Sequence, residues 1–150
     1  MDIKGGASWP ASALSNFAPH PFVIDGVECS SMEGFLQSLK FKNPEMQREV
    51  CKLVGKAAKM KGKGKNWQRK QELYWLGQTI DRHSKEYQVL LNRAYDELAK
   101  NSSFQKALLA TKDATLTHNI GRNDESQTVL TKREFISRLV RIRSELQKNE

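Results

Sequence analysis

Apolar residues recur at helical spacing in six parts of the chain, so the pattern predicts a mainly helical protein. In the first part, Met32, Phe35, Leu36 and Leu39 fall at positions i, i+3, i+4 and i+7. Side chains with this spacing lie on one face of a helix, which is expected to pack inward. The pattern predicts one helix from near Ser30 to the break at Asn43-Pro44, and further helices over residues 44–60, 67–81, 84–99, 103–110 and 132–147.

A short hairpin precedes the first helix. Two apolar triplets, Phe22–Ile24 and Val27–Cys29, flank Asp25-Gly26. An Asp-Gly pair between alternating apolar residues is a strong signal for a hairpin. Residues 115–117 are also strand-like. We therefore expect an α+β fold that is mostly helical, with a small β-sheet formed partly by this hairpin.

The chain has 150 residues, which suggests one domain large enough to bury a core without disulfides or metals. We place this domain at residues 14–143, after an N-terminal segment over residues 1–13 and before a C-terminal tail over residues 144–150. The last helix begins with a capping box, in which Thr131 is followed three residues later by Glu134. Its basic residues are expected to face solvent: Lys132, Arg133, Arg138, Arg141 and Arg143.

The net charge of +8 comes from one part of the chain. Residues 52–70 contain eight of the 25 basic residues and no acid, and the remaining 17 basic residues equal the 17 acids in number. Within this basic patch, residues 59–66 alternate lysine with glycine and are predicted to form a loop. A local patch indicates an anionic partner at one place on the surface, for which phosphate is the obvious candidate.

Several classes of protein are disfavoured. No apolar run approaches the ~20 residues of a membrane span, and the N-terminus lacks an apolar signal-peptide core, so we expect a cytoplasmic protein without a membrane partner. Three histidines and no Cys-x-x-Cys pattern argue against a structural zinc site. Cys29 and Cys51 fit reduced thiols, although the sequence does not exclude a disulfide between them. The spacing of a P-loop is absent.

The polar face of the first helix carries Glu33, Gln37 and Lys40 in one row. A carboxylate, an amide and an ammonium group in line suit a small polar ligand. Other interpretations remain open at this point. Glu33 can form a capping box with Ser30, bonding back to its amide, and Lys40 can be the solvated end of the helix.

Several short motifs together resemble the NADAR (YbiA-like) family of N-glycosidases, which act on ribosylated bases. They are Ser15-Asn16-Phe17, the hairpin with Asp-Gly, the Ser-x-Glu that ends at Glu33, and Gln37-x-x-Lys40-Phe41. The resemblance extends over about residues 9–143 through four later segments: Lys65-Asn66-Trp67, Leu108–Thr111, Leu116-x-His118 and Leu139-x-x-Ile142-Arg143.

This resemblance implies a set of site residues. Glu33, Trp67 and Asp124 match positions implicated in catalysis, and the Asn16-Phe17 turn and Lys40 are expected to line the pocket. The sequence departs from the family after Asp124, where Glu125-Ser-Gln-Thr-Val replaces the usual Trp-Gly, so Glu125 is the alternative to Asp124. Gly34 stands where many relatives carry histidine.

The residue types suit cleavage of a ribosyl C–N bond, which passes through an oxocarbenium-like state. Such a reaction needs a carboxylate near the anomeric carbon, help for the departing nitrogen, and a wall that excludes water. Glu33 and Asp124 are the candidate carboxylates, and Trp67 is the candidate wall. His118 is a candidate substrate-binding residue or acid. Each also has a purely structural interpretation: Trp67 as core, Asp124 as a turn residue and His118 as a satisfied loop histidine.

We therefore hypothesise a metal-independent, cofactor-free N-glycosidase acting on a phosphate-bearing ribosyl substrate. The resemblance suggests two substrate classes, ADP-ribosylated guanine (free or in nucleic acid) and ribosylamino intermediates of riboflavin synthesis. Phosphate would be held by Lys40 and by one or more of Lys61, Lys63 and Lys65. The alternatives are a non-catalytic nucleic-acid-binding domain, with the basic patch on backbone phosphates, and an ADP-ribose-binding module that does not cleave.

Overall fold

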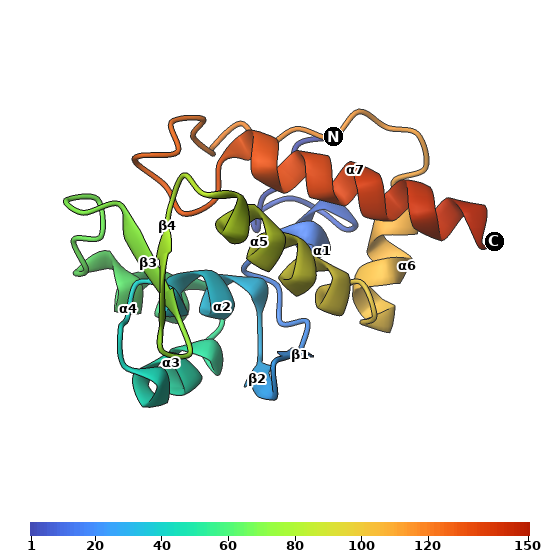
Figure 1. Cartoon of the computed structure of the whole chain (residues 1–150). Helices are drawn as coiled ribbons and strands as arrows, with labels where there is room; N and C mark the ends of the chain where they lie inside the picture. The colour runs from blue at the N-terminus through green and yellow to red at the C-terminus, as the bar shows by residue number, and fades with distance from the viewer.

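The computed structural model describes all 150 residues and contains seven helices and two antiparallel hairpins (Figure 1). The predicted architecture, α+β and mostly helical with a small β-sheet component, is confirmed. None of the helices is both long and apolar enough to cross a membrane. The elements in chain order are α1 Ala11–Leu14, β1 Phe22–Ile24, β2 Val27–Cys29, α2 Met32–Ser38, α3 Pro44–Cys51, α4 Gly55–Lys63, β3 Glu72–Trp75, β4 Gln78–Asp81, α5 Lys85–Leu98, α6 Ser102–Ala110 and α7 Lys132–Lys148.

The first hairpin forms where the sequence predicts it. β1 and β2 pair in an antiparallel register that sets Phe22 opposite Cys29 and Ile24 opposite Val27. Asp25 and Gly26 both have positive φ, 49° and 76°, as the tight two-residue turn of a hairpin requires. Cys29 and Cys51 are both buried and free.

The helix predicted over residues 67–81 is wrong, because this segment forms the second hairpin, β3–β4. Leu76 and Gly77 have φ values of 46° and 91° and reverse the chain between the strands. Leu73 and Trp75 are buried while the residues between and before them are half-buried. This alternation has the period of a strand, and the density of large apolar residues concealed it in the sequence.

The single helix predicted over residues 44–60 is also wrong, as is the basic loop predicted over residues 59–66. The chain breaks at residues 52–54 and starts again as α4, which continues through Lys63. Gly55 takes a left-handed φ of 59° at the break. Gly62 belongs to the helix, and an added Cβ there would lie 1.8 Å from Oε1 of Gln37. The glycine therefore allows close packing of α4 on α2.

α2 lies at the centre of the molecule and packs against α3 and α4 (Figure 1). Phe35 and Leu39 are fully buried on it. Its N-cap is Ser31, whose Oγ accepts a hydrogen bond from the amide of Gly34 at 3.0 Å. The capping box proposed for Ser30 and Glu33 is therefore wrong, and the Glu33 carboxylate remains available for another role.

The two ends of the chain are ordered parts of the body. Asp2 forms a parallel β-bridge with Thr117, and the amide of Ile3 donates to the carbonyl of Thr117 at 2.8 Å. Ile3 is fully buried. At the other end, α7 continues through Lys148. The N-terminal segment therefore contacts the loop around residue 117, close to the candidate site.

α7 begins with the predicted capping box, and both of its hydrogen bonds are present. The prediction that Arg138 faces solvent is wrong, because its side chain is buried. Its guanidinium donates to the carbonyl of Glu134 at 2.9 Å and to the side chain of Gln88 at 2.9 Å. A buried position is possible for this cation because α5 supplies acceptors that the sequence pattern of α7 does not reveal.

Candidate functional site

A cavity of about 700 Å³ opens between α2, α4 and three loops. The turn at residues 15–17 and the segment 64–68 form part of its wall. The segments 118–122 and 127–130, with Gly5, form the rest. Residues that are up to 125 positions apart in sequence, from Gly5 to Leu130, therefore meet in one place.

Glu33 is the only acidic residue that lines this cavity. It is half-buried on the first turn of α2, where its amide donates to the carbonyl of Asn16 at 3.0 Å. Its Oε1 accepts a hydrogen bond from Nε2 of Gln37 at 2.9 Å. Burial raises the pKa of the Glu33 carboxyl above its ordinary value, and the opposing effects of Gln37 and the nearby lysines do not cancel this increase.

The row of polar residues predicted on the first helix is present in the cavity. Gln37 and Lys40 line it beside Glu33. Burial lowers the pKa of the Lys40 ammonium, an effect that the carboxylate of Glu33 opposes and the charge of Lys59 reinforces. Lys40 is therefore part of the cavity floor, and the interpretation that it is only a solvated helix end does not hold.

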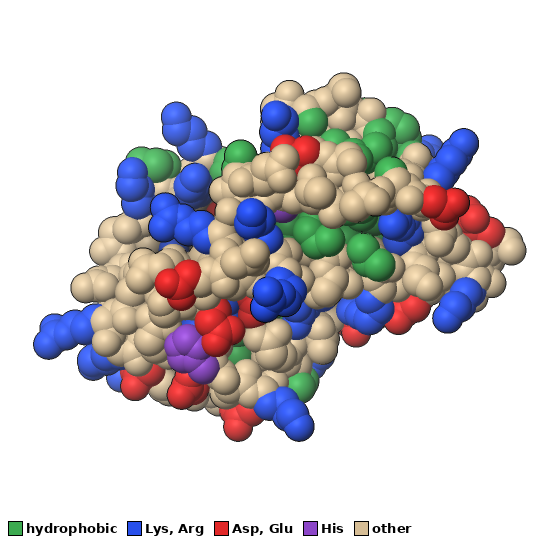
Figure 2. All heavy atoms as spheres, turned by 90° about the horizontal axis from the view of Figure 1, so that it is seen from above, with side chains coloured by type: hydrophobic (Ala, Val, Ile, Leu, Met, Phe, Trp, Pro, Cys, Tyr) green, Lys and Arg blue, Asp and Glu red, His purple; other side chains and the backbone are tan.

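Four further cations line the cavity: Lys59, Lys63, Lys65 and Arg122. Lys63 and Lys65 were predicted as phosphate-binding residues, whereas Lys59 and Arg122 were not. Lys61, the third predicted lysine, is exposed and does not line the cavity. Figure 2 shows that lysine and arginine side chains are spread over this face of the molecule, including its left-hand end, where Figure 1 places α4. The cavity is therefore positively charged around a single carboxylate.

Trp67 and the Asn16-Phe17 turn, which the resemblance implies as site residues, also line the cavity. Trp67 is only 5% exposed and belongs to the core, so it contributes a rigid edge to the wall rather than a free surface. The amide of Asn16 is held in place, because its Oδ1 accepts a hydrogen bond from the hydroxyl of Tyr95 at 2.7 Å.

Asp124 lies outside the cavity. It is exposed, and its Oδ1 accepts hydrogen bonds from the amide of Ser126 at 3.0 Å and from the hydroxyl of Ser126 at 2.7 Å. These bonds lower the pKa of the Asp124 carboxyl. Glu125, the alternative, is also outside and contacts Nδ1 of His83 at 2.6 Å. The structure does not bring either carboxylate to Glu33.

His118, unlike Asp124 and Glu125, lines the cavity. Its Nδ1 lies 2.7 Å from the carbonyl oxygen of Ile3. Its ring stands edge-on to Phe135, with the two centroids 5.1 Å apart. The ring is therefore fixed from two sides by residues that are far from it in sequence.

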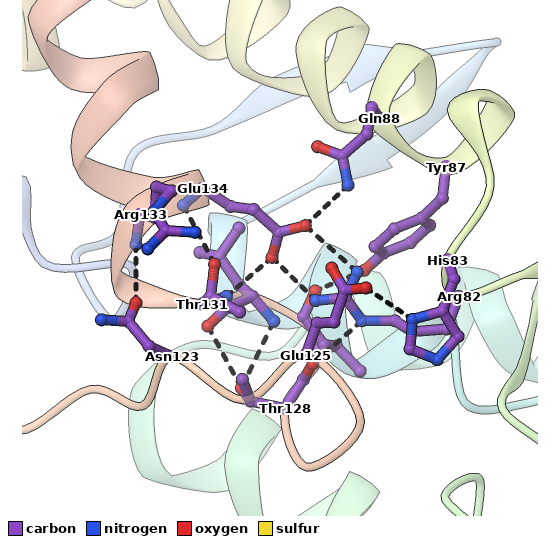
Figure 3. A network of polar contacts seen from close by, with 12 residues as sticks. Arg82, His83, Tyr87, Gln88, Asn123, Glu125, Thr128, Thr131, Arg133 and Glu134 are labelled. Carbon is purple, nitrogen blue, oxygen red and sulfur yellow. Dashed lines mark hydrogen bonds and ion pairs between the residues drawn. The ribbon is translucent and has the colours of Figure 1, made fainter.

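A buried network supports the wall at residues 127–130 from behind (Figure 3). The fully buried Arg82 makes a two-point ion pair with Glu134, at 3.1 and 2.7 Å, and its Nε donates to the carbonyl of Thr128 at 3.0 Å. The hydroxyl of Tyr87 donates to the carbonyl of Val129 at 2.6 Å. Arg82 was not predicted as a functional residue, because an arginine is ordinarily exposed.

No group of three or more His, Cys, Asp or Glu side chains is placed to hold a metal ion. Glu33, as the only acid of the cavity, can offer one carboxylate to a cation, and the surrounding lysines would repel it. The cavity is better suited to anions.

Comparison with known proteins gives consistent results. The family described as bacteriophage protein GP30.3 matches residues 8–144. A 17.1 kDa protein from the Gp30–rIII intergenic region of Enterobacteria phage T4 is 40% identical over 151 residues. The match covers 97% of this chain and 98% of the phage T4 protein. The NMR structure of the E. coli protein YbiA covers 99% of this chain and 85% of its own, with a TM-score of 0.65 and 18% identity. The YbiA-like fold implied by the sequence motifs is thereby confirmed.

Proposed function

This chain belongs to the bacteriophage GP30.3 family, and we propose that it is a metal-independent N-glycosidase that hydrolyses the bond between a base and a ribosyl group. The observation that supports this most directly is the half-buried carboxylate of Glu33, which is the only acid in a cavity that also contains five cations, Phe17 and Trp67. The YbiA-like fold agrees with this proposal, although fold alone does not define a reaction.

Glu33 is the proposed catalytic carboxylate. An oxocarbenium-like transition state carries positive charge on the sugar, and a carboxylate beside the anomeric carbon stabilises it or exchanges a proton with the reactants. The hydrogen bond from Gln37 fixes the direction of the Glu33 carboxylate. Trp67 and Phe17 would form the wall that keeps bulk water from the reacting atoms.

The cations indicate how the substrate would be held. Lys40, Lys63, Lys65 and the newly identified Lys59 and Arg122 would contact phosphate groups, with Asn16 and His118 contacting the sugar or base. Five cations along a cavity of about 700 Å³ favour a ligand with more than one phosphate. Of the two substrate classes, ADP-ribosylated guanine is therefore preferred over ribosylamino intermediates of riboflavin synthesis.

Asp124, with Glu125 as its alternative, is the proposed second carboxylate on the basis of the sequence. For Asp124 to act on a substrate beside Glu33, its hydrogen bonds to Ser126 would have to break and the turn would have to move toward the cavity. Lys61, which is exposed on α4, would need a substrate that extends beyond the cavity.

A turnover assay tests the proposal. Wild-type protein and Glu33→Gln would be incubated with ADP-ribosylated guanosine, with DNA carrying that modification, and with phosphorylated ribosylaminopyrimidines, and products would be identified by mass spectrometry. We expect the wild type to release free base or free nucleic acid with ADP-ribose or ribosyl phosphate, and Glu33→Gln to lose this activity. Glu45→Gln, on the exposed face of α3, is the matched control. Equal turnover by Glu33→Gln would rule out its catalytic role.

A non-catalytic nucleic-acid-binding module is the alternative, because Lys52, Lys56 and Lys70 are exposed outside the cavity. A protein that binds backbone phosphates loses affinity steeply as salt is added, and Glu33→Gln should not weaken it. Absence of turnover, together with such salt-dependent binding, would favour this function. Binding of ADP-ribose without any product would instead favour an ADP-ribose-binding module.

A further inference from the structure

The cavity contains one carboxylate, although hydrolysis of an N-glycosidic bond divides proton transfer between two tasks. One group must accept a proton from the attacking water, and another must assist the departing nitrogen. Glu33 is available for one task, and Asp124 is turned away on the surface. The remaining residues of the cavity that can exchange a proton include His118, whose surroundings determine which of its ring nitrogens is available.

We propose that Nε2 of His118 accepts the proton from the attacking water, so that His118 rather than a second carboxylate completes the catalytic pair with Glu33. This inference rests on the proposed glycosidase function. It assigns the role of general base to a residue that the sequence suggested as a ligand contact or an acid.

The tautomer of His118 follows from its contact with the N-terminal segment. A carbonyl oxygen can only accept a hydrogen bond, so the Nδ1 atom that lies 2.7 Å from the carbonyl of Ile3 must carry the hydrogen. In the neutral ring, Nε2 then has a free lone pair. No protein group hydrogen-bonds to Nε2, and the ring lines the cavity.

The surroundings of the ring keep Nε2 accessible. Gly121 lies against it, and an added Cβ there would be 2.5 Å from Cδ2 and 3.2 Å from Nε2 of His118. Because glycine has no side chain, position 121 leaves open the space beside Nε2 that a Cβ would occupy. Phe135 supports the ring on another side, with the two centroids 5.1 Å apart.

The charged groups around His118 suit a base that becomes positively charged. Glu33 faces it from α2, and burial raises the pKa of Glu33 while a positive charge on His118 is one of the smaller effects that oppose this rise. Asp2 faces it from the N-terminal segment, where the same charge contributes to lowering the pKa of Asp2. Lys132, on α7, packs its aliphatic Cγ near Gly121. Two carboxylates therefore stand near the imidazolium that forms, and their negative charge offsets part of the repulsion from Lys132 and from the five cations that line the same cavity.

The proposed step balances as a hydrolysis. The water oxygen forms a bond to the anomeric carbon and gives one proton to Nε2 of His118. The C–N bond breaks and its electron pair passes to the base nitrogen, which takes a proton from Glu33, a carboxyl group whose protonated form is favoured by burial. His118 then returns its proton through solvent while Glu33 is reprotonated, so that one water is consumed.

The variant His118→Asn separates this role from a structural one. An asparagine side-chain nitrogen stands at the position of Nδ1, so it can keep the hydrogen bond to the carbonyl of Ile3 while lacking Nε2. We expect kcat to fall by about 100- to 10,000-fold, with KM changed by less than ~3-fold. Added imidazole should restore part of the activity of His118→Gly. His83→Asn, which removes an exposed histidine outside the cavity, is the matched control and should keep wild-type turnover.

The outcomes distinguish this inference from the proposed function. If the wild type turns over substrate and His118→Asn retains its kcat, or changes only KM, the assignment of His118 is overturned while the glycosidase stands. Loss of turnover in Asp124→Asn, with His118→Asn active, would return the role to Asp124. If the wild type releases no base from any substrate, the function itself fails, and this role with it.

Discussion

At the scale of single residues, the orientation of the Glu33 carboxylate depends on Gly62, which has no side chain. Gln37, which is 6% exposed, donates to Glu33 through Nε2, while its Oε1 has no hydrogen-bond partner and faces Gly62 on α4. Glycine at position 62 therefore leaves the space between α2 and α4 that the side-chain amide of Gln37 occupies. The orientation of the only carboxylate in the cavity depends on this close approach.

The substitution Gly62→Ala tests this dependence. Its Cβ would lie 1.8 Å from Oε1 of Gln37, so the amide must move and its hydrogen bond to Glu33 is expected to break. The cost of moving Gln37 is offset by the better helix propensity of alanine, worth about 1 kcal/mol, so the free energy of unfolding should change by less than ~1 kcal/mol. We expect kcat of the proposed reaction to fall at least ~10-fold, as for a misplaced catalytic group.

Urea titration and steady-state kinetics measure the two effects. Gly6→Ala is the control, because an added Cβ there meets nothing within 4 Å. Unchanged kcat in Gly62→Ala would show that Gln37 does not orient Glu33.

At the scale of elements, β4, α5 and the start of α7 together hold one wall of the cavity. Burial raises the pKa of the Glu134 carboxyl, but hydrogen bonds from Arg82, Gln88 and the amide of Thr131 outweigh this effect, so the pKa is lowered. Arg82 and Tyr87 bind the carbonyls of residues 128 and 129 from the same side. The wall is therefore supported by the ion pair of Arg82 and Glu134, whose side chains do not line the cavity (Figure 3).

Replacing Arg82 by methionine is expected to lower the free energy of unfolding by about 3–5 kcal/mol, because Glu134 would remain as an uncompensated buried charge. The double variant Arg82→Met/Glu134→Gln should recover part of this loss. Chemical denaturation of both proteins measures the difference. The exposed pair of Arg48 and Glu45 provides the comparison, and Arg48→Met should cost less than ~1 kcal/mol. A similarly small effect of Arg82→Met would contradict the supporting role of this ion pair.

The elements also show where sequence pattern suffices. The β1–β2 hairpin, α5 and the capping box of α7 depend on neighbours in sequence, and all three were predicted from local signals. The β3–β4 hairpin was missed because Trp67, Tyr74 and Trp75 gave an apolar density that also fits a helix. The break before α4 was missed because it depends on a left-handed glycine, Gly55, which a lysine- and alanine-rich run does not indicate.

At the scale of the whole molecule, the site was partly predictable for a similar reason. Glu33 and Gln37 lie on one face of α2 and Lys40 lies in the turn that follows it, so their spacing alone brings them together. Lys59 and Arg122 reach the cavity only through the packing of α4 and of the loop before α7. Asp124 was predicted from its neighbours in sequence, but its hydrogen bonds to Ser126 turn it outward.

The raised pKa of Glu33 also affects the stability of the whole molecule. A carboxyl whose pKa is raised on folding favours the folded state while it is protonated, and this contribution is lost as pH rises through the folded pKa. We therefore expect Glu33→Gln to become increasingly more stable than the wild type as pH rises from about 4.3, the ordinary value for glutamate. The difference should level off above the folded pKa of Glu33.

Thermal or urea unfolding of both proteins across this pH range measures the difference, with Glu45→Gln run in parallel. A difference between Glu33→Gln and the wild type that falls with rising pH would contradict a Glu33 pKa that burial raises.

The contact between Ile3 and His118 joins residues 115 positions apart in the chain. During synthesis, α2, α3 and α4 can associate early, since they are close in sequence. The carbonyl of Ile3, by contrast, must wait for more than three quarters of the protein to be made before its partner exists. Closing so long a loop is also slow. The proposed catalytic pair would therefore assemble only in a nearly finished chain, and partial translation products would carry Glu33 without the group that completes it.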